Sequence, residues 1–129
     1  KFINSISKKY DCLVSTDVIE HVTDPLNLLA DMINIVEEDG YLIIAHCFVP
    51  VIKCHLPTTF HLRYTFDLFA KLLGIKHLGY CKKRRITVYK KVNNKPFNWK
   101  VISIFEKISK IIYPLIRCIH IVYEFILMR

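Results

Sequence analysis

The stretch that decides the fold is YDCLVSTDVIEHVTDPLNLLADMINIVEEDGYLIIA, residues 10–45. Its first seven residues, Tyr10–Thr16, form an apolar run that ends at a polar cluster, which predicts a buried strand. A second apolar run at 41–48 predicts another buried strand. Apolar residues between the two runs recur at helical spacing: Leu28, Leu29, Met32, Ile33 and Val36. Two strands joined by a helix make a βαβ unit, so we expect parallel pairing and a right-handed crossover.

The predicted helix of this unit has recognisable ends. Asp24 is placed to cap its first turn, and Pro25 suits the first helical position because proline fixes the backbone angle that a helix needs. We therefore expect the helix over residues 25–36. A turn should follow it at Glu37, Glu38, Asp39 and Gly40.

The segment at 49–64 shows no periodic pattern. Pro50 and Pro57 exclude a regular helix from it, because proline lacks the backbone N–H and clashes with the preceding turn. Since this segment follows the carboxyl end of the second predicted strand, we expect it to form part of a pocket wall.

The next predicted elements are a helix and two strands. Thr65 is a candidate cap for a helix at 66–73, and Gly74 stands where a helix C-terminus favours a left-handed residue. The runs at Ile75–Cys81 and 85–92 predict an antiparallel hairpin at a sheet edge, where charged side chains discourage further pairing. The hairpin would turn at three basic residues, Lys82, Lys83 and Arg84.

After a linker at 93–96, the remainder of the chain is an amphipathic tail. We therefore divide the chain into residues 1–96 and a helical extension at 97–129. The tail predicts one or two helices, with a kink or break at Pro114. A membrane-spanning helix needs about 20 predominantly apolar residues, and every such window is interrupted by Lys110, Pro114, Arg117, His120 or Glu124. Two interpretations stay open: the tail packs against the sheet or a second subunit, or it lies in a membrane interface.

Composition narrows the class of protein. A chain of 129 residues suits one domain, and an apolar fraction of 53% excludes a disordered chain. The net charge of +8 suggests a nucleic-acid partner, but the basic cluster at 82–85 lacks interleaved aromatic residues, so we expect none. The five cysteines form no CxxC pair, which favours reduced thiols and a cytoplasmic location, with peripheral membrane contact through the tail as an option.

Residues 10–45 resemble the fourth strand, following helix and fifth strand of class I S-adenosylmethionine-dependent methyltransferases. The resemblance rests on an acidic residue and a hydrophobic pair followed by Glu-His-Val and Asp-Pro, here Asp17, Val18, Ile19, Glu20, His21, Val22, Asp24 and Pro25. Residues 61–74 are similar to the family's segment before its last two strands. The family usually carries Lys-Pro-Gly-Gly at the turn where this chain has Glu38, Asp39 and Gly40.

This resemblance, over about residues 10–92, implies an α/β fold. The expected architecture is a partial Rossmann-like sheet of the family's strands four, five, seven and six with flanking helices, plus a C-terminal helical tail. The implied function is methyl transfer from S-adenosylmethionine to an unidentified small-molecule or sugar/lipid-like acceptor.

The family's glycine-rich cofactor loop has no counterpart in this sequence. The three glycines, Gly40, Gly74 and Gly79, form no GxGxG pattern after a first strand. We therefore expect the chain to be part of a longer protein, with that loop before Lys1. We also expect the 129 residues alone to be inactive.

The resemblance implies several cofactor-binding residues. Thr16 and Asp17 would flank the methionine part of S-adenosylmethionine at the carboxyl end of the first strand, with Ser15 as a lesser candidate. His21 would belong to a network at the start of the following helix, near the cofactor. The alternative for Thr16 and Asp17 is a simple strand-ending turn.

The same motif raises the question of a metal. Some relatives hold magnesium with an acid-x-x-Glu-His pattern, which Asp17, Glu20 and His21 match in outline. Magnesium prefers oxygen ligands, so one histidine is not diagnostic of it. We predict no metal here and leave this set, and His21 as a general base, as alternatives.

Substrate contacts are predicted in the pocket-wall segment. His61 and Tyr64 are the candidates, with Arg63 beside them, and a solvated loop histidine is the alternative for His61. His46 lies inside the second predicted strand, where we expect a core residue with satisfied hydrogen bonds.

A second function class is also open. In it the chain is a non-catalytic, truncated Rossmann-like module that docks on a membrane or a protein partner. The basic, apolar tail at 97–129 would be its docking element.

Overall fold

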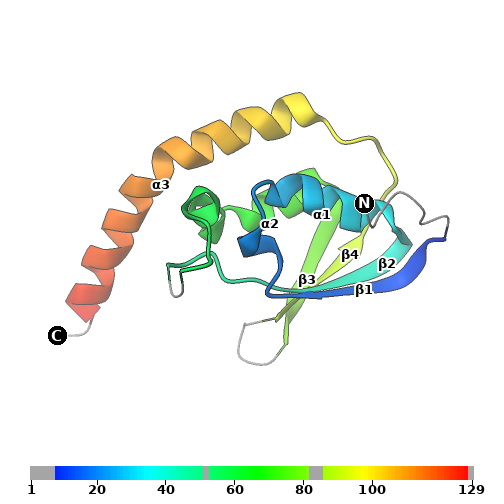
Figure 1. Cartoon of the computed structure of the whole chain (residues 1–129), viewed down its shortest axis with the longest axis horizontal. Helices are drawn as coiled ribbons and strands as arrows, with labels where there is room; N and C mark the ends of the chain where they lie inside the picture. The colour runs from blue at the N-terminus through cyan, green and yellow to red at the C-terminus, as the bar shows by residue number, and fades with distance from the viewer. Residues whose placement is uncertain (1–7, 51–52, 82–85, 128–129) are drawn as a thin grey trace.

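The chain forms a mixed four-stranded sheet flanked by helices, as a computed structural model of the protein shows (Figure 1). The structure describes residues 8–50, 53–81 and 86–127. The regular elements, in order, are β1 (Tyr10–Thr16), η1 (Ile19–His21), α1 (Pro25–Asn34), β2 (Val36–Ala45), η2 (Pro57–Arg63), α2 (Phe66–Leu72), β3 (Ile75–Cys81), β4 (Ile86–Lys91) and α3 (Trp99–Leu127).

The sheet has the predicted order and pairing. β1 and β2 run parallel, with Leu13 opposite Leu42 and Thr16 opposite Ala45, and β4 lies between β2 and β3 in antiparallel pairing. The spatial order β1-β2-β4-β3 matches the expected order of strands four, five, seven and six. The turn of the β3–β4 hairpin, at Lys82–Arg84 in the sequence, lies outside the described residues.

One face of the sheet is covered by α1 and α2 (Figure 1). The hydrophobic core lies between this face and the two helices. Side chains of β2 and β4 alternate between this face and the other, as the two-residue period of a strand requires. The core also includes residues of β3, α3 and the two 3₁₀ helices. The largest fully buried apolar side chains are Tyr89, Phe69, Ile19, Leu29, Ile33, Leu42, Ile44, Leu62, Leu73, Ile75 and Ile102.

The prediction that the first strand is buried is wrong. β1 forms an edge of the sheet and pairs with β2 alone among the described strands, so most of its side chains are exposed. Val14 is 64% exposed, and Ser15 is the only buried residue of the strand. An apolar run indicates that both faces of a strand are apolar. It does not show whether other segments of the protein pack on these faces.

α1 begins as predicted and ends two residues earlier than expected. The Asp24 carboxylate accepts a hydrogen bond from the Asn27 backbone N–H at 3.1 Å, and Pro25 occupies the first turn. β2 already starts at Val36, so the predicted turn at 37–40 belongs to this strand as a register shift between Val36 and Tyr41. A Cβ atom on Gly40 would lie 2.8 Å from the Asp11 carbonyl oxygen, so glycine fits there best.

From the end of β2 onwards, two features differ from the prediction and one agrees with it. β2 ends at Ala45, not at residue 48, because its antiparallel partner strand β4 starts opposite that residue, at Ile86. Residues 57–63 form the 3₁₀ helix η2, for which Pro57 supplies the first turn. Gly74 ends α2 in the expected left-handed conformation, with φ of 83°.

Thr65 does not cap α2 with its side chain, which corrects the prediction. It holds the N-cap position, but its hydroxyl donates a hydrogen bond to the His61 carbonyl at 2.9 Å and contacts the Ser109 hydroxyl of α3 at 2.8 Å. A tertiary contact therefore replaces the local one.

The predicted tail is a single helix, α3, with Pro114 inside it. Its first half packs on the body of the fold through Ile102 and Ser109, which are its buried residues. The helix bends along its length and its second half projects away from the sheet (Figure 1), as the lost hydrogen bond and steric clash of an internal proline lead us to expect. Within the part of the chain that the structure describes, no helix is both long and apolar enough to cross a membrane.

A buried lysine ties the sheet to α1. Lys91 of β4 is 2% exposed, and its ammonium donates hydrogen bonds to the Ile33 carbonyl at 2.9 Å and the Val36 carbonyl at 2.8 Å. These carbonyls belong to the end of α1 and the residues after it, where the helix dipole favours a positive charge. Burial is the main reason why the pKa of Lys91 is lowered, because desolvation disfavours the charged ammonium.

We predict that Lys91→Met lowers the free energy of unfolding by about 2 to 3 kcal/mol, because two charge-assisted hydrogen bonds are lost and two carbonyls lose a partner. Urea denaturation of the chain would measure the difference. Lys90→Met is the matched control, since Lys90 forms an exposed ion pair with Asp39 at 2.8 Å, and such pairs contribute little. Equal losses in the two variants would contradict this account of Lys91.

Candidate functional site

The candidate site lies at the carboxyl ends of β1 and β2. These ends are level with each other, because Thr16 pairs with Ala45 and the Asp17 backbone N–H donates to the Ala45 carbonyl at 3.1 Å. The loops that follow the two strands therefore leave the same edge of the sheet. Ligand sites of open α/β sheets lie outside this edge.

The three residues predicted at the end of β1 follow one another in the chain, and their side chains differ in exposure. The Ser15 side chain is 6% exposed, and its hydroxyl has no partner among the described residues. Thr16 and Asp17 are exposed, and Asp17 adopts a left-handed conformation with φ of 53°. Asp tolerates this conformation better than most residues, so the chain can turn sharply away from the strand. That all three bind a cofactor stays a prediction.

Glu20 joins the two loops of the site. It is fully buried, and its Oε1 accepts a hydrogen bond from the Cys47 backbone N–H at 3.0 Å, just after β2. Its own carbonyl accepts from the Leu56 N–H at 3.2 Å, further along the second loop. The short helix η1 turns Glu20 into this position because the neighbouring Ile19 is anchored in the core. Its second oxygen, Oε2, has no partner in the described chain.

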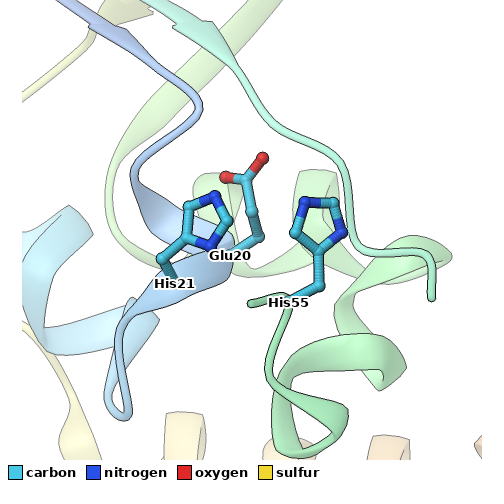
Figure 2. A group of neighbouring side chains, drawn as sticks. All are labelled: Glu20, His21 and His55. Atoms are coloured by element: carbon cyan, nitrogen blue, oxygen red, sulfur yellow. The ribbon is translucent and has the colours of Figure 1, made fainter. Parts of the chain in front are cut away.

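Two histidines face Glu20. His21 follows it in η1, and His55 comes from the loop after β2, so that all three side chains converge (Figure 2). The His21 and His55 rings meet edge to face with centroids 4.9 Å apart. Sequence reasoning selected His21 but missed His55, because this histidine lies in a loop with no periodic pattern and no motif spacing to His21.

A pocket of about 250 Å³ lies further along the same edge of the sheet, beside the ends of β2 and β3. It contains the predicted substrate residue Tyr64, and Arg63 lies beside it. The residues that line it are His46, Arg63, Tyr64, Phe66, Asp67, Tyr80 and Thr87. Its aromatic walls and one carboxylate suit an acceptor with a flat or apolar body and a hydrogen-bonding group.

His61 lies apart from this pocket. It is 4% exposed, so the solvated alternative does not hold. Its Nδ1 bonds the Thr58 carbonyl at 2.9 Å, and its Nε2 lies 3.9 Å from the Glu106 carboxylate of α3. Burial is the main reason why its pKa is lowered. A substrate contact by His61 stays a prediction.

His46 follows β2 and lies outside any strand, which corrects its predicted position. Its ring packs on Phe48 and Phe66, with centroid distances of 4.8 and 4.3 Å. No side-chain hydrogen bond of His46 is found within the described residues, where these ring contacts surround it instead. Burial lowers the pKa of His46 to about 4, partly offset by the nearby Asp67 carboxylate.

The chain was also compared with known protein families. A family described as a methyltransferase domain matches residues 2–91, which is more than half of the chain and includes the whole sheet. The chain therefore belongs to the methyltransferase domain family, and its sheet is part of a Rossmann-like methyltransferase fold. Among curated proteins, none matches the chain.

We predict that His46 makes the fold sensitive to acid. Its pKa is about 4 in the folded chain and about 6.5 when unfolded, so between these values the unfolded state binds a proton that the native state does not. Stability should therefore fall as the pH drops from 6.5 towards 4, by roughly 3 kcal/mol in total. Denaturation at several pH values should show a flatter dependence for His46→Gln, and an unchanged one for His120→Gln on α3. A parallel pH dependence in all three proteins would refute this assignment.

Proposed function

We propose that the chain forms the C-terminal half of an S-adenosylmethionine-dependent methyltransferase domain in a longer protein. The observation that carries the proposal is the level ending of the parallel strands β1 and β2, with Ser15, Thr16 and Asp17 at that edge. The family match over residues 2–91 supports methyl transfer in general. In the proposed complete domain, the glycine-rich loop precedes Lys1.

The residues present fit part of such a cofactor. The buried Ser15 hydroxyl lacks a partner among the described residues, and the exposed Asp17 carboxylate can accept hydrogen bonds from an ammonium group. When bound, the cofactor would supply an electrophilic methyl group. The protein's contribution to such a transfer can consist largely of positioning, so no nucleophilic side chain is required.

The acceptor would occupy the pocket beside Tyr64. This pocket opens at the same edge of the sheet as Asp17, and its volume of about 250 Å³ suits a small molecule or the head of a larger one. Tyr64 and Asp67 line it and offer a hydroxyl and a carboxylate for orienting an acceptor hydroxyl or amine. We therefore favour a small-molecule or sugar/lipid-like acceptor.

Calorimetry with S-adenosylmethionine tests the proposal on two forms: the 129-residue chain, and a longer form that includes the segment proposed to precede Lys1. We expect the extended form to bind S-adenosylmethionine. In a separate methyl-transfer assay, we expect no turnover by the 129-residue chain. In the extended form, Asp17→Ala should weaken binding by about ten- to a hundredfold, since a charged hydrogen bond is lost. Asp31→Ala, on the exposed side of α1, is the control. If the extended form does not bind S-adenosylmethionine, the proposal is wrong.

A second candidate function rests on α3. The part of this helix after Ser109 carries exposed apolar side chains, with Ile111 80% exposed, and basic residues lie along the helix. The exposed apolar residues of this part include Ile111, Ile112, Leu115, Ile119, Ile121, Val122 and Ile126. An apolar helix with Lys and Arg is suited to the interface of an anionic membrane, so we propose that α3 holds a cytoplasmic protein at a membrane surface.

Co-sedimentation with phosphatidylserine-containing vesicles checks the role of α3. We expect the chain to bind and a double variant, Leu115→Glu with Ile119→Glu, to lose most of this binding, because two charges enter the apolar surface. Both positions are exposed and lie beyond the packed residues Ile102 and Ser109, so folding should be unaffected. Ser103→Glu, exposed in the first half of α3, is the matched control. Equal sedimentation of the chain and the double variant would exclude the membrane role.

A further inference from the structure

We propose that Glu20, His21 and His55 form a binding site for a divalent transition metal, with Zn²⁺ as the preferred ion. Each residue offers one ligand atom, and these atoms all lie within 4.8 Å of one another. In a tetrahedral zinc site with bonds of 2.0–2.2 Å, two ligand atoms lie about 3.3 Å apart. Small side-chain rotations would therefore close the site around an ion.

The hydrogen bonds of the two histidines prepare the rings for a metal. His21 Nδ1 lies 3.0 Å from the Cys54 carbonyl oxygen, and His55 Nδ1 lies 2.6 Å from the Val49 carbonyl oxygen. A carbonyl only accepts, so each Nδ1 must carry the proton and each Nε2 keeps its lone pair. Both Nε2 atoms point towards the Glu20 carboxylate (Figure 2). Metal-binding histidines almost always donate their other N–H to such a carbonyl or carboxylate.

Glu20 supplies the third ligand. Its side chain is fully buried, and Oε1 is occupied by the Cys47 N–H. Oε2 has no hydrogen-bond partner among the described residues, although a buried carboxylate oxygen without one is costly. A cation between Oε2 and the two imidazoles would remove this cost and neutralise the charge.

The ligand set selects the type of metal. Two imidazole nitrogens and one carboxylate oxygen suit zinc and its neighbours in the first transition row, whereas magnesium and calcium prefer oxygen alone. Asp17 is not part of the group, so the site differs from the acid-x-x-Glu-His outline in the sequence and from the prediction of no metal. Three protein ligands leave a fourth position for water or another oxygen.

An ion bound at this site would link two loops. Glu20 and His21 follow β1, and His55 follows β2, so one ion would fix both loops at the edge of the sheet where Ser15 and Asp17 lie. This inference is independent of the proposed methyl transfer, because the three ligands and their hydrogen bonds lie within this chain. Loss of either proposal would leave the other standing.

The test uses the purified chain after treatment with a chelator. Titration with ZnCl₂ in a calorimeter should show one strong site per chain, and Co²⁺ should give visible d–d bands without a thiolate charge-transfer band. Saturating zinc should raise the Tm by several degrees, since a ligand of the native state stabilises it. MgCl₂ should bind far more weakly.

The variants are chosen to keep the fold. His21→Asn and His55→Asn retain a donor near the position of Nδ1 but remove Nε2, and Glu20→Gln retains an oxygen for the Cys47 N–H. Each should leave the Tm of the metal-free chain close to the original and weaken zinc binding by at least about a hundredfold. His120→Asn controls for loss of a histidine elsewhere, and Cys54→Ser for capture of zinc by the exposed thiol beside His55.

Three results would overturn the proposal. The first is the absence of stoichiometric zinc and cobalt binding by the chain. The second is binding that survives in His55→Asn and Glu20→Gln. The third is binding that disappears in Cys54→Ser or shows a thiolate band with cobalt, because either result would place the ion on a cysteine.

Discussion

The parallel pairing of β1 with β2 is the constraint on which the rest of this structure depends. It brings the ends of two strands that are 29 residues apart in sequence to the same level, at Thr16 and Ala45. Because both following loops start there, Glu20 from the first loop can reach the Cys47 N–H in the second. The polar residues after β1, the convergent histidines and the aromatic pocket all lie along this one edge.

The sequence contained most of the fold and little of the site. Apolar runs, the Asp24–Pro25 start and Gly74 predict the strands and helices correctly because each depends on local chemistry. The path of residues 46–64 could not be predicted, because a 3₁₀ helix lacks the period of 3.6 residues. His55 is placed by tertiary hydrogen bonds, among them Leu56 N–H to the Glu20 carbonyl, which leave no pattern in the sequence. The prediction that β1 is buried was wrong, because the burial of a strand depends on which other segments pack against it, and the sequence of the strand itself does not show this.

Tyr64 connects the pocket to the C-terminal helix α3. The Tyr64 ring lines the pocket and lies near the rings of Tyr113 and His120 on α3, with centroids 6.2 and 5.7 Å away. Thr65 and Ser109 join the same two regions by a hydrogen bond. A surface that binds the second half of α3 would therefore lie close to whatever occupies the pocket. An acceptor that itself resides in a membrane is consistent with this proximity.

The exposed position of β1 has a consequence for the behaviour of the chain in solution. Among the described residues β1 pairs on one side only, so its other side presents a row of N–H and C=O groups to any extended peptide, and Val14 adds an apolar surface beside them. Such an edge favours intermolecular strand addition, which grows with protein concentration. A further strand paired with β1 would extend the sheet, and it would also block such fibril-like association between molecules.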